Sequence, residues 1–319
     1  MRRNRQRCLG LVLAVLLGAA CAPPASRPPP EPAEWDGYDD PVPTGLGFLV
    51  DDMALTPVQQ SLDLDGDSLP DAAVNRALAP MATAINDAFR SSVQTGRICV
   101  ALELVGVDDP YGCDDRSVTI KYFTCEDADQ DPANNFCGAP ECGHAVLDPN
   151  DLDGDQALYR TEPAPVQQCR LATVMDQTIM LKLDEDDLPM ERTRFAVFIP
   201  DTLRELMEIR IAGSARIRDT QRVSIPICRY MPILCINPNT PDEISLAQYM
   251  RLIGEHPDLD MDGDGLERYD LDGQAQVVRC IDGDGTIIES PTCLDDPRIA
   301  DAFSMCLGAH AVSAVLQLP

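Results

Sequence analysis

The feature that most limits how this chain can fold is the alternation of apolar and polar residues that begins after Gly96. Ile209 and Ile211, for example, alternate with Arg210, as in a strand that buries one face. Short, evenly spaced strands joined by polar turns predict a mainly β fold, an antiparallel sandwich or barrel. The predicted strands cover residues 45–50, 98–107, 117–124, 157–159, 169–174, 178–183, 195–199, 208–217, 222–227, 276–281 and 302–318. The last of these is long and apolar, so we expect it to lie centrally in a sheet.

A helical segment is predicted before these strands, over residues 71–94. Asp71 can serve as its N-cap, and Pro80 should kink the helix or split it in two. Its apolar stripe, at spacings of three to four residues, consists of Val74, Leu78, Met81, Ile85 and Phe89. A second, short helix is predicted over residues 245–253.

The N-terminus has the pattern of a secretory signal. Residues 1–7 are basic, residues 9–17 are apolar, and small residues then precede Cys21. We therefore interpret residues 1–20 as a signal peptide. The ending, Leu17-Gly-Ala-Ala-Cys21, resembles a bacterial lipobox, and the resemblance implies a diacylglyceryl anchor on Cys21. Ala22, which follows, favours sorting to the outer membrane. The alternative is an ordinary secreted protein that is cleaved near this point.

A proline-rich segment, residues 21–44, follows the signal and is interpreted as an extended, lipidated tether. Residues 45–319 then form the predicted β-rich domain. The full chain carries 53 acidic and 25 basic residues, a formal charge of -28. Such a surface repels phosphate backbones, which excludes nucleic acid as an expected partner. Bound cations would offset the repulsion within the chain itself.

Thirteen cysteines in an exported chain indicate disulfides. Short loop lengths favour two pairs, Cys228 with Cys235 and Cys280 with Cys293. A third group, Cys125, Cys137 and Cys142, is expected to staple a loop rich in Asp and Asn. Zinc binding near His144 is the weaker interpretation, because a fourth ligand is not evident nearby.

Three stretches place carboxylates on alternate residues beside glycine, which is how a tight loop surrounds a hard cation. We call them the first (63–71), second (151–162) and third (258–265) Asp loops. Their candidate ligands are Asp63, Asp65, Asp67 and Asp71; Asp151, Asp153, Asp155 and Glu162; and Asp258, Asp260, Asp262 and Asp264. Calcium is favoured over magnesium, because it tolerates many flexible oxygen ligands.

The third Asp loop can be read in two frames, which start at Asp258 or at Asp260, and Glu267 supplies a further oxygen. Such overlapping frames resemble thrombospondin type 3 repeats, and the second loop partly resembles an EF-hand loop. Both resemblances imply ion binding only. The alternative for each loop is a solvated acidic turn. For residues 282–285 that turn is the preferred interpretation, as part of a hairpin.

The chain as a whole resembles bacterial lipobox lipoproteins of an uncharacterised family, a likeness that implies no activity. No nucleophile elbow, zinc-protease helix or phosphate-binding glycine loop is present in the sequence. We therefore expect a calcium-binding, disulfide-bonded lipoprotein with a structural or adhesive role, which binds an envelope protein or a glycan. The alternatives are an exported hydrolase, carboxylate- or metal-dependent, and a periplasmic assembly subunit.

Overall fold

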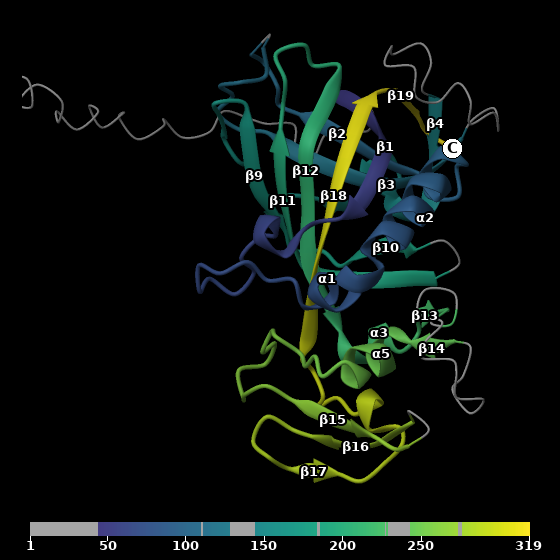
Figure 1. Ribbon diagram of the computed structural model, residues 1–319. Coiled ribbons are helices and arrows are strands. Elements are labelled where there is room, and N and C mark those ends of the chain that lie inside the picture. Colours follow the sequence, from purple (N-terminus) through teal and green to yellow (C-terminus); the bar gives the residue numbers. More distant parts are fainter. Residues whose placement is uncertain are drawn as a thin grey trace, which may run out of the picture. The chain divides into compact units, whose positions relative to one another are not determined.

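The computed structural model describes residues 44–109, 111–127, 144–183, 186–226, 228, 243–273 and 276–319 (Figure 1). These residues all belong to one compact unit, Glu34–Pro319. The predicted signal peptide, Cys21 and nearly all of the tether lie outside the described residues. Among the helices of the described part, none is both long and apolar enough to cross a membrane.

Most of the strands belong to one 12-stranded sheet, in the order β19-β4-β3-β2-β1-β18-β12-β11-β9-β8, with β10 paired to β11 and β7 to β3. The strands are β1 (Leu46–Leu55), β2 (Val100–Val105), β3 (Thr119–Asp127), β4 (His144–Leu147), β7 (Tyr159–Arg160), β8 (Val166–Gln167), β9 (Arg170–Met175), β10 (Ile179–Leu183), β11 (Asp186–Phe198), β12 (Glu205–Arg216), β18 (Ala302–Ser313) and β19 (Val315–Gln317). The pair β4–β19 is parallel, so the sheet is mixed.

The sheet curls around a single main core. Ile120 and Tyr122 of β3 share this core with Leu171 of β9 and Leu181 of β10, although the strands lie toward opposite ends of the strand order. The Tyr122 hydroxyl donates to the Met180 carbonyl at 3.4 Å. Two halves of one sheet thus face each other across a shared interior. The prediction of a mainly β, sandwich-like fold is confirmed.

Strand β18 lies between β1 and β12, so the predicted central position is confirmed for residues 302–313; residues 315–317 form β19, at one end of the strand order, where the prediction is wrong. The residues of β18 alternate between the two faces of the sheet. Met305 and Leu307 enter the main core, whereas Gly308 and His310 are partly exposed on the opposite face. This opposite face of β18, which we call the outer face, carries both features described below.

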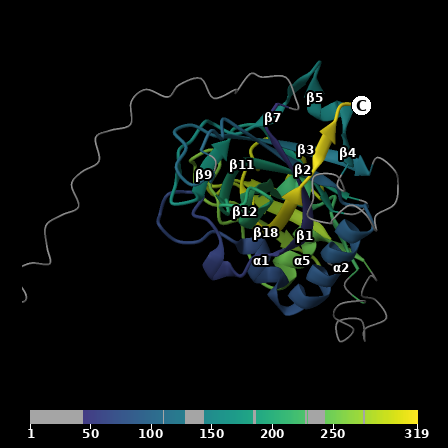
Figure 2. The ribbon, with the colours of Figure 1, turned by 90° about the horizontal axis from the view of Figure 1, so that it is seen from above.

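The predicted N-terminal helix is split at Pro80. Helix α1 (Ala73–Leu78) runs into a 3-10 turn, η2 (Ala79–Met81), and α2 (Ala82–Gln94) follows. These helices pack along β1 and β18 (Figures 1 and 2). The expected N-cap role of Asp71 is wrong: the N-cap is Ala72, which makes no side-chain cap, and the Asp71 carboxylate accepts from the Leu64 amide instead.

Smaller elements follow β12 and lie near the start of β18, where Leu259 forms a bridge with Ala302. The helix predicted over 245–253 is α5, closed by a capping box between Ser245 and Gln248. The strand predicted over 222–227 is reduced to two residues, and the hairpin predicted around residues 282–285 joins β16 to β17. These elements are α3 (Ile217–Thr220), β13 (Ser224–Ile225), β14 (Ile244–Ser245), α5 (Leu246–Leu252), β15 (Arg268–Leu271), β16 (Val277–Ile281), β17 (Ile287–Ile288) and η6 (Cys293–Asp295). Between β1 and β8 the chain also forms η1 (Val58–Gln60), η4 (Pro149–Asp151), β5 (Leu152–Asp153) and β6 (Gln156–Ala157).

Disulfides cross-link the domain, so the prediction of disulfide bonds is confirmed. The predicted Cys280–Cys293 bridge is confirmed. Cys228 is also disulfide-bonded, but its predicted partner, Cys235, lies outside the described residues. The expectation for Cys125 is wrong: Cys125 lies on β3 and is bonded to Cys99, the residue immediately before β2. A further bridge joins Cys113 to Cys169, while Cys306 is the free, buried cysteine of the described part.

Candidate metal centres

The first Asp loop folds around its own leading carboxylate. Asp63 accepts from the Gly66 amide at 2.6 Å through Oδ1 and from the Ser68 amide at 2.9 Å through Oδ2. Gly66 has φ 90° and Ser68 has φ 70°, so both adopt the left-handed backbone that lets the loop close. These backbone donors, the Gly66 amide foremost, lower the pKa of Asp63.

Asp71 completes a group of three carboxylates in this loop. Oxygen atoms of Asp63, Asp65 and Asp71 lie within 4.8 Å of one another, a spacing that can hold a metal ion. Asp71 is buried, and its burial raises the pKa of the carboxyl against the opposing effect of the Leu64 amide. Asp67, the fourth predicted ligand, is not in this group, and its carboxylate accepts from the Leu69 amide at 2.7 Å.

The third Asp loop repeats the same local arrangement. Asp260 accepts from the Gly263 amide at 2.6 Å and from the Gly265 amide at 3.1 Å, which are again the amides three and five residues later. Gly263 and Gly265 have φ 85° and 114°. Asp260, Asp262 and Asp301 form a group with the same 4.8 Å limit between oxygens. Asp301 thus holds the place that Asp71 holds in the first loop.

Asp301 is held in place by a reciprocal clamp with Glu267. Asp301 accepts from the Met261 amide at 2.9 Å and from the Glu267 amide at 2.8 Å. Glu267 in turn accepts from the amides of Ala300 and Asp301, both at 2.8 Å. Both side chains are completely buried. The clamp joins the third Asp loop to the residues that immediately precede β18.

A second group overlaps the first at this place. Asp262, Asp264 and Glu267 also bring oxygens within 4.8 Å of one another, so Asp262 belongs to both groups. Desolvation and the neighbouring Asp262 and Asp282 carboxylates raise the pKa of Asp264 to about 6. Desolvation, with repulsion from Asp301, raises the pKa of Glu267 to about 7 despite its two backbone donors. Burial, together with the neighbouring negative charges, therefore opposes ionisation at this site.

The structure selects between the two frames of the third Asp loop. Asp258 does not belong to either group; its carboxylate accepts from the Ser304 amide at 2.8 Å and from the Ser304 hydroxyl. It thereby attaches the loop to β18. The frame that starts at Asp260 is the one in which carboxylates converge, and the predicted role of Asp258 as a metal ligand is not supported by its position.

The second Asp loop does not gather its carboxylates. None of Asp151, Asp153, Asp155 and Glu162 belongs to a group of three donors within the described residues. Asp151 is buried and accepts from the amide and hydroxyl of Thr124 on β3, at 2.5 and 2.7 Å. The other three side chains are exposed. Asp151 therefore fastens this loop to the sheet.

The first and third Asp loops are anchored to the same outer face. Leu64 and Leu259 pack in a small cluster with Ala212 of β12 and Cys306 of β18. Arg194 of β11 donates to the carbonyls of Asp63 and Leu64, at 2.5 and 3.2 Å. Sequence reasoning found the two loops but missed Asp301, because nothing in its own surroundings has the alternating pattern.

The comparisons with known proteins assign no family to this chain: no family model, curated protein or solved structure matches it. The carboxylate groups are therefore interpreted on their geometry alone. Each offers hard oxygen donors of high charge density, which suits a divalent cation of the Ca²⁺ or Mg²⁺ class.

Proposed function

We propose that this protein is an exported, lipid-anchored calcium-binding protein of the cell envelope, with a structural or adhesive role. Calcium would occupy the first and third Asp loops and brace them against the outer face of the sheet. The braced domain would then offer a face to an envelope protein or a glycan. Anchoring through Cys21, in the outer membrane, rests on the lipobox pattern of residues 17–21.

The observation that carries the calcium proposal is the recurrence of one arrangement at two separate places. Asp63 and Asp260 make the same pair of hydrogen bonds to amides three and five residues later. In both loops a further, buried carboxylate comes from outside the alternating run and approaches the first two. A solvated acidic turn has no need of a buried third carboxylate, because desolvating that charge is unfavourable.

Charge favours a cation of this kind. The chain has a formal charge of -28, and the pKa of Asp264, Glu267, Asp71 and Asp301 is raised by burial and by neighbouring carboxylates. A divalent cation would relieve this repulsion more effectively than solvent does. Calcium is favoured over magnesium because Ca²⁺ accepts six to eight flexible oxygen ligands, whereas Mg²⁺ requires near-ideal octahedral geometry and retains its waters.

Isothermal titration of the metal-free protein with calcium, and separately with magnesium, tests the proposal. We expect calcium to bind more tightly, and the Asp63→Asn and Asp260→Asn variants each to lose sites. Asp153→Asn is the matched control, since it makes the same charge change in the second Asp loop. Equal calcium uptake by all three variants would refute the assignment, as would tighter binding of magnesium.

The anchor is tested independently by fractionation of cells that express the full chain or its Cys21→Ser variant. The full chain should partition with the outer membrane and incorporate labelled fatty acid, and the variant should do neither. Protease treatment of intact cells then distinguishes a surface-facing protein, which is digested, from a periplasmic assembly subunit, which is protected. Fatty-acid labelling of the variant would contradict lipidation at this cysteine.

A further inference from the structure

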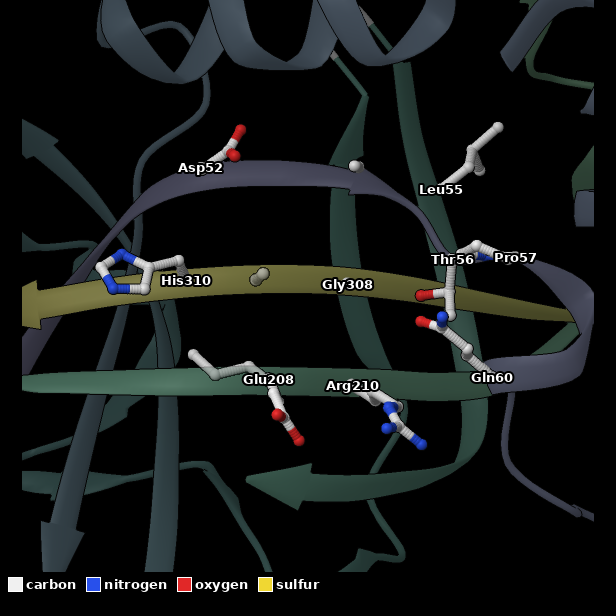
Figure 3. Close-up of a pocket in the computed structure, with 12 residues that line it drawn as sticks. Asp52, Leu55, Thr56, Pro57, Gln60, Glu208, Arg210, Gly308 and His310 are labelled. Atoms are coloured by element: carbon white, nitrogen blue, oxygen red, sulfur yellow. The ribbon is translucent and has the colours of Figure 1, made fainter. Parts of the chain in front are cut away.

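A cavity of about 530 Å³ opens on the outer face of the sheet (Figure 3). Its base is formed by β1, β18 and β12, and one wall is formed by the segment that runs from the end of β1 into η1. This volume falls in the range of small-molecule sites, roughly 300–1,000 Å³. None of the grouped carboxylates of the Asp loops lines it.

The floor of the cavity exists because β18 carries a glycine there. Gly308 lies opposite Ala54 of β1 and Arg210 of β12 in the strand register. A Cβ atom on Gly308 would lie 3.2 Å from the Thr56 hydroxyl oxygen, which is closer than most such contacts. The floor is therefore free of side-chain atoms at Gly308, and polar residues lie around it.

The acidic residues of the cavity wall are already paired. Asp52 contacts Arg90 of α2 at 3.2 Å, and Glu208 contacts Arg170 of β9 at 2.9 Å. His310 lies between two further carboxylates: its Nδ1 contacts Asp51, and its Nε2 contacts Glu205 at 3.1 Å. Each negative charge near the cavity thus has a partner supplied from the side.

Arg210 is the exception among the charged residues of the lining. It is half-buried and extends from β12 beside Glu208 (Figure 3), and its guanidinium forms no hydrogen bond or ion pair with any residue that the structure describes. Its guanidinium retains five donors for a ligand. Gln60 of η1 also lines the cavity, and its side-chain amide makes no hydrogen bond to a described residue.

We propose that this cavity binds the carboxylate of a small organic acid, with Arg210 as the anchoring group and the Gly308 floor under the apolar part of the ligand. Guanidinium and carboxylate match in a bidentate geometry. A singly charged carboxylate suits one unpaired arginine. A phosphate dianion would need more positive charge than one guanidinium supplies, in a chain with a net charge of -28.

The test is ligand-observed NMR on the full chain in neutral detergent, with hexanoate and phenylacetate as probes. Their amides, hexanamide and phenylacetamide, share the apolar part and lack the charge, and inorganic phosphate serves as a competing anion. We expect the carboxylates to bind with Kd in the millimolar range and the amides to bind about tenfold more weakly. The Arg210→Gln variant should weaken carboxylate binding about tenfold as well.

Two further variants keep the result independent of folding. Arg222→Gln removes an exposed arginine that does not line the cavity, and it should leave Kd unchanged. Glu208→Gln removes a carboxylate that lines the cavity, and it should tighten carboxylate binding several-fold. The proposal is overturned by failure of every carboxylate to bind, by equal binding of acids and amides, by preferential binding of phosphate, or by an unchanged Kd in a folded Arg210→Gln variant.

Discussion

The first and third Asp loops share their local geometry and differ in where the third carboxylate originates. Asp71 lies within the first loop, so that group is closed over nine consecutive positions of the chain, 63–71. Asp301 lies just before β18, far along the chain from Asp260, and Glu267 clamps it there. The first loop closes on itself, whereas the third joins two distant parts of the domain.

This difference predicts different consequences of ion binding. Occupancy of the first loop orders a local segment and contributes little to global stability. Occupancy of the third loop holds the start of β18, the central strand of the sheet, and should stabilise the whole fold. The overlap at Asp262 further predicts a second ion at the third loop, whereas the first has one group.

The largest expected effect follows from Asp301→Asn. In saturating calcium this change removes a ligand and a charged acceptor of two buried amides, and should lower the free energy of unfolding by about 3 kcal/mol. Denaturant unfolding with and without calcium measures it. The difference from wild type should shrink in chelator, where only the hydrogen bonds are lost. The control is Asp295→Asn, an exposed aspartate of η6; equal destabilisation by both would contradict the comparison.

Asp71→Asn should have a smaller global effect, of about 1–2 kcal/mol, because its carboxylate serves one local loop. The change should instead open that loop. Hydrogen exchange at the Leu64 amide should accelerate in calcium, while exchange in β18 stays as in wild type. If Asp71→Asn lowered the free energy of unfolding as much as Asp301→Asn does, the first loop would stabilise the whole fold as strongly as the third, against the comparison.

The pH dependence of the metal-free protein should report the third loop. The folded-state pKa of Glu267 is raised to about 7 and that of Asp264 to about 6, above their unfolded values. The folded state therefore binds more protons, and stability should fall as pH rises from the unfolded pKa of these acids to about 7. Saturating calcium should remove most of this fall. Thermal unfolding of the metal-free protein from pH 4.5 to 8 measures this dependence. A stability that rises through this interval would contradict the prediction.

Local signals allowed most of the fold to be predicted. Pro80 has no backbone N–H to donate a helical hydrogen bond, so it splits the helix whatever the tertiary structure around it. Ser245 and Gln248 form their capping box within one turn. The apolar composition of residues 302–318 predicted a central strand, which is correct for β18 but not for β19, at the edge of the sheet. Each of these features is set by residues that are close in the sequence, so it can be predicted from one sequence alone.

The site was predicted only in part, because its decisive contacts come from distant segments. Asp258 and Asp260 fit the loop pattern equally well, and only the proximity of Ser304 on β18 assigns Asp258 to anchoring. Asp151 leads the loop with the best partial match to the EF-hand pattern, yet Thr124 of β3 takes its carboxylate. Asp301 has no motif of its own. The spacing of ligands along the sequence carries no information on partners from distant segments.

His310 provides a reference outside both loops, and the smallest stability effect. Burial lowers its pKa, but hydrogen bonds to Asp51 and Glu205 outweigh that effect, so the pKa is raised. The contacts of protonated His310 with Asp51 and Glu205 should stabilise the fold fully below the pKa that His310 has in the unfolded state. This stabilisation should be lost as the pH rises through the higher pKa of the folded state. Because the side chains are partly exposed, His310→Asn should lose only about 0.5 kcal/mol in acid and nothing in alkali. Thermal unfolding should give the same stability difference between wild type and His310→Asn with and without calcium. A difference that depends on calcium would link His310 to the Asp loops.

The most direct test of the two-loop account is the calcium stoichiometry of the natively purified protein, by elemental analysis and titration calorimetry. The three carboxylate groups of the described residues predict at least three ions per chain, with one lost in Asp63→Asn and two in Asp262→Asn, which removes the shared ligand. Absence of divalent metal together with absence of calcium uptake would contradict the account, and equal losses in the two variants would contradict the difference between the loops.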